Sequence, residues 1–242
     1  MDAYNRVSNA SHVIDTESAL KHWDSRRAAT DADLTVAPQN ISATAARTEA
    51  LLRVLNWMER KDLDISASQI LDVGCAQGYG LRPFLLSGFR MNQLHGIDLF
   101  ADRVEHGKTL TPDMDLRVGD ATAMPYADRS FDIVCEQFCF CHIPDADAKT
   151  KIAREMMRVS KRYILIHDWR AGSERKKLYS VSQANIRQWF PGWNIALRVP
   201  SQLWPPIGRP LSSHAWPLYD LARMFSPLVG SWMTVLSCSQ HD

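Results

Sequence analysis

ILDVGCAQG, residues 70–78, is the stretch of sequence that decides the fold of this chain. An apolar strand over residues 69–73 runs into a glycine-containing turn over 74–80, and a helix is expected over 81–87. The turn, GCAQGYG, misses the G-x-G-x-x-G spacing with which a dinucleotide site meets a pyrophosphate. This spacing disfavours a nicotinamide dehydrogenase, although the helix N-terminus after the turn still favours an anion.

The alternation of strand and helix continues on both sides of that stretch. Further strands are expected over 94–99, 115–118, 130–137 and 162–169, and helices over 43–61, 101–109 and 145–159. Apolar, uninterrupted strands that alternate with helices predict an α/β fold with a doubly wound, mostly parallel sheet. In such a sheet the ligand crevice lies at the carboxyl ends of the strands.

Three acidic residues, Asp72, Asp98 and Asp120, stand near the carboxyl ends of successive predicted strands. Their separations of 26 and 22 residues fit one βα unit each, so the three carboxylates can face a single extended ligand. Asp98 suits the vicinal diol of a ribose, Asp120 an exocyclic amine such as that of adenine, and Asp72 a cationic ammonium group. Together with the glycine turn, these acids are strong evidence for a nucleoside-type ligand.

Four motifs in this order resemble those of the class I S-adenosylmethionine (SAM)-dependent methyltransferases of the type 11-like group. They are ILDVGCAQGYGL (70–81), GIDLF (96–100), VGDATAMPYADRSFDIV (118–134) and EMMRVSKRYILIHDW (155–169). The resemblance implies a Rossmann-like sheet of seven strands with an antiparallel last strand, SAM as the cofactor and methyl transfer as the activity. Two departures are Ala76, where the family usually has glycine, and the absence of the usual Pro-Gly-Gly turn before the fifth strand.

The resemblance also implies which residues hold each part of the cofactor. The methionine part is assigned to the first motif, the ribose to the end of the second strand and the adenine to the third motif. In that order, the residues are Asp72, Gly74, Cys75, Ala76 and Gly78; Asp98 and Leu99; and Asp120 and Ala121. Glu136 and Gln137 end the fourth strand and are candidates for the methionine or acceptor pocket. Because Ala is small, residue 76 is expected to require only a modest adjustment.

A general base would help if the methyl acceptor is an aliphatic hydroxyl, which is a poor nucleophile. The candidates near the crevice are His142, after the fourth strand, and His167, which ends the fifth strand together with Asp168. Histidine takes a proton near neutral pH because its ordinary pKa lies close by. The competing interpretation of each histidine is a polar residue at a strand end whose hydrogen bonds are satisfied within the protein.

The whole chain is expected to form one methyltransferase domain. Its parts are an N-terminal helical cap over 1–60, a SAM-binding core over 61–170 and a C-terminal part over 171–242. Two strand-like segments, 193–199 and 232–236, enclose a Pro- and Trp-rich insert at about residues 200–231, in which a helix is expected over 216–225. A connection of that length suggests a binding element on the acceptor side. A further amphipathic helix is possible over 16–30.

Composition restricts the partners and the compartment. With 28 basic and 27 acidic residues, the chain has no net field to attract a phosphate backbone, so nucleic acid is not expected as a partner. No uncharged apolar run is long enough to cross a bilayer, and no signal peptide is indicated, which predicts a cytoplasmic protein. Five cysteines without a zinc spacing predict reduced thiols and no metal.

The methyl acceptor is expected to be a small molecule or a saccharide, methylated at oxygen. The C-terminal stretches PPIGRPL (205–211) and SHAWPLYDLARMFSPL (213–228) show a weak resemblance to methyltransferases of bacterial cell-surface polysaccharide synthesis. A methyltransferase that acts on RNA or protein, and a SAM-binding protein without turnover, are the alternatives. The oligomeric state stays open.

Overall fold

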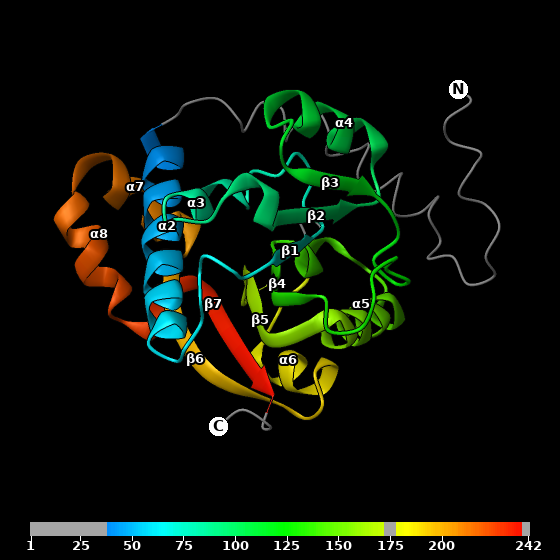
Figure 1. Ribbon diagram of the computed structural model, residues 1–242. Helices are drawn as coiled ribbons and strands as arrows, with labels where there is room; N and C mark the ends of the chain where they lie inside the picture. Colours follow the sequence, from blue (N-terminus) through cyan, green and yellow to red (C-terminus); the bar gives the residue numbers. More distant parts are fainter. Residues whose placement is uncertain (1–37, 172–177, 239–242) are drawn as a thin grey trace.

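The computed structural model describes residues 38–171 and 178–238, which form a seven-stranded sheet with helices on both faces (Figure 1). The strand order is β3-β2-β1-β4-β5-β7-β6. The strands are β1 (Ile70–Val73), β2 (Leu94–Asp98), β3 (Asp115–Val118), β4 (Phe131–Gln137), β5 (Ser160–Trp169), β6 (Trp193–Leu203) and β7 (Val229–Cys238). The helix expected over 16–30 lies outside the described residues.

The pairing of the strands confirms the predicted sheet. β1 lies in the middle, parallel to β2 on one side and to β4 on the other, with Ile70 level with both Leu94 and Ile133. β7 runs antiparallel to both β5 and β6, so the last strand is the reversed one. Because β1 is buried on both faces, it consists of an apolar run rather than an alternating pattern.

Helices cover the two faces of the sheet and bury separate apolar clusters. On one face, α2 (Pro38–Glu59), α3 (Arg82–Leu85) and α4 (Ala101–Leu110) pack on side chains such as Ile70 and Cys135. On the other face, α5 (Ala146–Val159) and α6 (Gln183–Trp189) pack on Val73 and Val134. Because successive side chains along a strand point to opposite faces of the sheet, the strands contribute to both apolar clusters.

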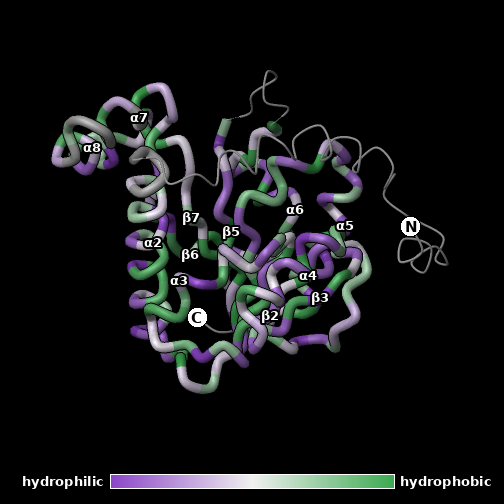
Figure 2. The backbone as a smooth tube through the Cα atoms, turned by 90° about the horizontal axis from the view of Figure 1, so that it is seen from above, coloured by the Kyte–Doolittle hydropathy of each residue, from purple (hydrophilic) through white to green (hydrophobic). Residues whose placement is uncertain are grey.

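The insert between β6 and β7 is helical. It contains α7 (Pro205–His214), α8 (Trp216–Arg223) and a short 3-10 turn (Ser226–Leu228). Both views place α7 and α8 beside α2, at the side of the molecule away from α4 and α5 (Figures 1 and 2). The insert is shorter than expected because β6 and β7 each extend beyond their predicted ends.

Two helices, α6 and α7, are not predicted from the sequence. α7 contains Pro210 in its interior and begins with two prolines, so its composition indicates a loop rather than a helix. α6 begins at a capping box in which Ser182 and Asn185 exchange hydrogen bonds, a signal that uses Asn in place of the usual Glu or Gln.

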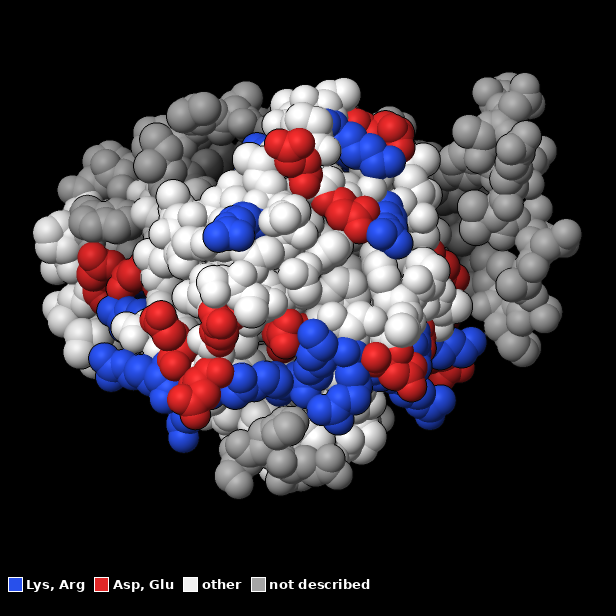
Figure 3. Space-filling model, in the orientation of Figure 1, with Lys and Arg blue, Asp and Glu red and all other residues white. Residues whose placement is uncertain are grey.

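Charged side chains are mixed over the surface. Figure 3 shows Lys and Arg with Asp and Glu among them, including along the lower part of the face seen in Figure 1. Within the described parts of the chain, no helix combines the length and the apolar character that a membrane crossing requires.

Candidate functional site

A cavity of about 260 Å³ opens at the carboxyl ends of β1, β2 and β4, where a parallel sheet places its ligands. Its walls come from the glycine turn after β1, the β2–α4 junction, the turn after β3 and the segment that follows β4. The lining residues are Gly74, Ala76, Ile97, Asp98, Leu99, Phe100, Arg103, Gly119, Asp120, Ala121, Gln137, Phe138, Cys139, His142, Ile143, Pro144, Asp145 and Ile152.

The glycine turn forms the floor of the cavity through its backbone. Gly74, Ala76 and Gly78 all have positive φ, at 77°, 47° and 75°, so the turn is left-handed at alternate residues. At Gly74 an added Cβ would meet the Cys139 Sγ at 2.5 Å, so a side chain here would collide with the segment after β4. The turn therefore brings bare backbone to the cavity.

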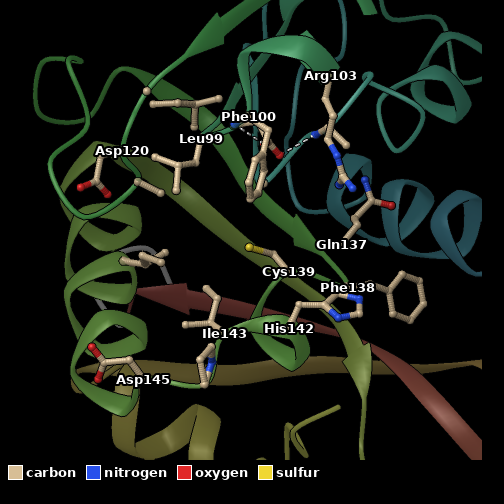
Figure 4. Close-up of a pocket in the computed structure, with 18 residues that line it drawn as sticks. Leu99, Phe100, Arg103, Asp120, Gln137, Phe138, Cys139, His142, Ile143 and Asp145 are labelled. Atoms are coloured by element: carbon tan, nitrogen blue, oxygen red, sulfur yellow. Dashed lines mark hydrogen bonds between the residues drawn. The ribbon is translucent and has the colours of Figure 1, made fainter. Parts of the chain in front are cut away.

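Asp98 ends β2 with its carboxylate at the cavity wall. Its Oδ2 accepts a hydrogen bond from the Ala76 N–H at 2.8 Å and its Oδ1 accepts one from the Phe100 N–H at 3.0 Å (Figure 4). Each carboxylate oxygen has further acceptor capacity, so Asp98 can also accept from a diol. Burial raises the pKa of Asp98, against the lowering effect of these two backbone hydrogen bonds.

Asp120 lies at the opposite end of the cavity from Gln137 and Phe138, with Leu99 and Phe100 between them (Figure 4). The Asp120 Oδ1 accepts from both the N–H and the hydroxyl of Thr122, at 2.8 Å each. This turn fixes the carboxylate, and its second oxygen accepts no hydrogen bond from the described residues.

The structure brings eight of the predicted site residues to the cavity, and it places four elsewhere. Those that line it are Gly74, Ala76, Asp98, Leu99, Asp120, Ala121, Gln137 and His142. Those that do not are Asp72, Cys75, Gly78 and His167, and Glu136, the further pocket candidate, is also buried outside the lining. Cys75 and Gly78 belong to the turn but contact neighbouring core residues. The Cys75 Sγ faces Gly96, and Gly78 faces the Leu116 side chain.

Asp72 lies below the cavity rather than in its wall. It is buried at the end of β1, where it accepts a weak hydrogen bond from the Cys135 Sγ at 3.5 Å. Burial raises the pKa of Asp72 to about 7, with a hydrogen bond from Gln137 acting in the other direction. Asp72 therefore lies outside the cavity lining, and its assignment to the ammonium group stays a prediction.

His142 and His167 are in different environments. His142 lines the cavity from the short 3-10 turn Phe140–His142, beside Phe138 (Figure 4). His167 is fully buried on β5, and burial, assisted by the nearby charge of Arg47, lowers its pKa to about 3. A histidine with so low a pKa is a poor proton acceptor, so the structure does not favour His167 as a general base.

Sequence reasoning missed several residues of the cavity wall. Phe100, Arg103, Phe138, Cys139 and Ile143 all line it. One available signal was their place directly after the second and fourth strands, where a parallel sheet gathers its ligand contacts. Phe138 also has φ +59°, which is rare for an aromatic residue and is typical of functional sites.

The lining fits SAM on the chemistry of its groups. The carboxylate of Asp98 can accept from a ribose diol, and the glycine turn lets backbone approach an amino-acid end. Asp120 and Ala121 provide a carboxylate and a backbone N–H at the far end, where an adenine edge needs both an acceptor and a donor. The apolar side chains of Leu99 and Ile143 between them suit the faces of a purine.

Residues 71–163 match the family model described as a methyltransferase domain. The chain is 32% identical over 97 residues to a demethylmenaquinone methyltransferase of Renibacterium salmoninarum, a match that covers 40% of this chain and 38% of the relative. It is 35% identical over 97 residues to an ajmaline N-methyltransferase of Rauvolfia serpentina, covering 38% and 32%. The matched segment therefore spans about a third of the length of these relatives.

Among solved structures, the chain resembles the magnesium protoporphyrin IX methyltransferase from Synechocystis with bound SAH, at a TM-score of 0.62 and 14% identity. This likeness covers 93% of the chain and 96% of that structure. The [4+2]-cyclase SpnF is also similar, at a TM-score of 0.52 and 18% identity, over 74% and 78% of the two chains. At these identities the likeness shows the fold alone.

Proposed function

We propose, from the match of residues 71–163 to the methyltransferase domain model, that the chain transfers a methyl group from SAM to a small-molecule acceptor. The single observation that carries the proposal is the joint placement of Asp98 and Asp120 in one cavity beside the left-handed glycine turn. A nucleoside that also has an amino-acid end needs contacts of these kinds.

Each part of the wall has a role in this proposal. Asp98 and Leu99 hold the ribose, Asp120 and Ala121 the adenine, and the backbone of Gly74 and Ala76 the methionine part. When bound, SAM supplies the methyl group in an activated form as a sulfonium, so the protein mainly positions donor and acceptor. The walls next to Phe138 and His142 are those left for the acceptor.

We propose that the acceptor is a small molecule, a class that includes saccharides. We also propose that the acceptor is methylated at oxygen. The matched relatives named for demethylmenaquinone, for 2-methyl-6-phytyl-1,4-hydroquinone and for ajmaline support a small acceptor. His142 supports oxygen as the methylated atom, because a neutral imidazole in the cavity wall can take the proton that a hydroxyl loses on methylation.

The test of the cofactor is the binding of S-adenosylhomocysteine, the demethylated product of SAM, to the full chain by isothermal titration calorimetry. Asp98→Ala removes the ribose acceptor and should raise the Kd about 10- to 100-fold, the effect of a hydrogen bond to a charged group. The matched control is Asp113→Ala, an exposed acid outside the cavity, which should leave the Kd unchanged. Equal affinity of Asp98→Ala and the unaltered chain would contradict the assignment.

The test of the activity is release of S-adenosylhomocysteine from SAM in the presence of panels of phenols, quinols, carboxylic acids and saccharides. Turnover with at least one panel is the expected result. Methylation of RNA or of protein substrates alone would move the acceptor to another class. Binding of the cofactor without transfer to any panel would favour a non-catalytic SAM-binding protein.

A further inference from the structure

Arg47 is a half-buried cation next to the cavity that has no anionic partner in the described part of the chain. It lies on α2 between Ala46 and Ala50, which pack into the core. Its guanidinium donates to the Thr44 Oγ1 at 3.1 Å, and no ion pair with a carboxylate is formed among residues 38–171 and 178–238. Burial lowers the pKa of Arg47, and the nearby Tyr219 acts in the opposite direction.

Other arginines near the same helix are neutralised. Glu49, two residues further along α2, pairs with Arg53 at 2.6 Å and with Arg223 of α8. Arg223 also pairs with Asp220 at 2.6 Å. The described acids of this region are thus directed to other cations, and none of them neutralises Arg47.

Phe138 connects Arg47 to the cavity. The Arg47 Cζ lies 6.0 Å from the centre of the Phe138 ring, and that ring lines the cavity (Figure 4). The positive φ of Phe138 turns the chain sharply at the end of β4 and costs about 1–3 kcal/mol. Strain of this kind, on an aromatic residue in a cavity wall, is typical of a binding site.

His167 packs against the same Phe138 ring from β5. The two rings lie 4.4 Å apart between centres, at an angle of 54°. The His167 side chain is fully buried and does not line the cavity. Its contact with Phe138 therefore supports the position of that ring in the cavity wall.

We infer that Arg47 and Phe138 form a subsite for an anionic oxygen group, a carboxylate or an ionised phenol, on the methyl acceptor. Such a group accepts hydrogen bonds from the guanidinium and offsets its charge. The Phe138 ring supplies an apolar face for the body of the acceptor. This inference rests on the proposed function, whose acceptor class it narrows.

The amino-acid end of SAM also carries a carboxylate, so the cofactor is the other source of the same chemistry. S-adenosylhomocysteine contains this carboxylate, and 5′-methylthioadenosine lacks it. If Arg47→Leu weakens the binding of S-adenosylhomocysteine and leaves that of 5′-methylthioadenosine unchanged, the anion belongs to the cofactor, and the assignment to the acceptor is overturned. Unchanged binding of both nucleosides is expected.

The direct test uses benzoate as the anionic probe and benzyl alcohol as its neutral counterpart, titrated by NMR into the full chain saturated with S-adenosylhomocysteine. Benzoate should bind at least about tenfold more tightly than benzyl alcohol, and Arg47→Leu should remove this preference. Arg53→Leu is the matched control, since it removes an exposed cation of the same helix, and it should preserve the preference. Equal benzoate affinity in the unaltered chain and in Arg47→Leu would overturn the inference.

Thermal unfolding separates a binding role from a structural one. Because Arg47 is half-buried and forms no ion pair with a described residue, Arg47→Leu should leave the Tm unchanged or raise it. A Tm lowered by more than a few degrees would show that Arg47 supports the fold instead, and Arg47→Lys, with the charge kept, should then restore it. If the unaltered chain fails to bind S-adenosylhomocysteine, the proposed function fails, while the benzoate titration on the chain alone still decides the subsite.

Discussion

Two residues of the cavity wall have backbone conformations that their side chains disfavour. Ala76 and Phe138 have φ of 47° and 59°, in the left-handed region where glycine is the usual residue. Both line the cavity, at the ends of β1 and β4. At these two positions the backbone is strained and places a small methyl group and an aromatic ring in the cavity wall.

Ala76→Gly should increase the free energy of unfolding by about 0.5–1 kcal/mol, because glycine adopts the left-handed conformation without steric cost. Urea denaturation at constant pH measures the change. The control is Ala45→Gly at an exposed position inside α2, which should decrease the free energy by about 1 kcal/mol. A loss of stability in both variants would show that Ala76 is not strained.

The substitution His142→Gln tests whether this single residue acts as a general base. With a hydroxyl acceptor, kcat should fall about 100-fold or more while the KM for SAM stays the same, because proton removal is lost and cofactor contacts are kept. His106→Gln, at an exposed position of α4, should have no effect. An unaltered kcat would limit His142 to shaping the cavity.

At the scale of elements, the segment after β4 is held by carboxylates from two neighbouring strands. The Glu136 Oε2 accepts from the N–H of Cys139 at 2.9 Å and of Phe140 at 3.3 Å. The Asp168 Oδ2 of β5 accepts from the Cys141 N–H at 2.8 Å. Because this segment carries Cys139, His142 and Ile143, the two strand ends together set the position of one cavity wall.

The insert is attached to the domain through α2. Arg223 of α8 is largely buried and reaches both Glu49 and Asp220. Tyr219 and Leu203 pack with Ala46 in a small separate apolar cluster. Since this cluster is small, the ion pair is a substantial part of the contact between α8 and α2.

Glu49→Gln should therefore loosen α8 without unfolding the sheet. The expected loss is about 0.5–1 kcal/mol, because Glu49 is partly exposed and the pair is screened by solvent. Hydrogen exchange should quicken in α7 and α8 and stay slow in β1 and β4. Glu59→Gln, at the other end of α2, is the control. Equal exchange in the insert of both variants would show that packing alone holds it.

For the whole molecule, several acids are buried in and near one end of the sheet. Burial raises the pKa of Asp72 to about 7 and that of Asp168 to about 6. Burial and the charge of Asp168 raise the pKa of Glu136 well above its ordinary value. His167 is the opposite case, with a pKa lowered to about 3. The folded chain is thus adapted to hold protons on carboxyl groups.

The free energy of unfolding should fall as pH rises from 6.5 to 8. Above the ordinary Asp pKa the unfolded chain has released protons that folded Asp72 and Glu136 retain, so rising pH favours unfolding. His167 acts in the opposite sense, but only between about pH 3 and 6.5.

Thermal unfolding without ligand measures this effect, with a lower Tm expected at pH 8 than at pH 6.5. Glu136→Gln replaces the carboxyl with a neutral group that can still accept the two backbone hydrogen bonds, so its Tm should depend less on pH. Asp113→Asn, at an exposed position, should show the same dependence as the unaltered chain. A Tm that rises from pH 6.5 to 8 would contradict the buried carboxyls as the source.

The sequence by itself determined the sheet, the reversed last strand through its resemblance to known motifs, and the strand-end positions of Asp98 and Asp120. These are local properties, since apolar runs, glycine turns and their spacing along the chain are written in neighbouring residues. Only the tertiary structure separated His142 from His167 and set Asp72 below the cavity. Burial, pKa and the meeting of Arg47 with Phe138 depend on which elements pack together, and residues 91 positions apart in the chain carry no local sign of that contact.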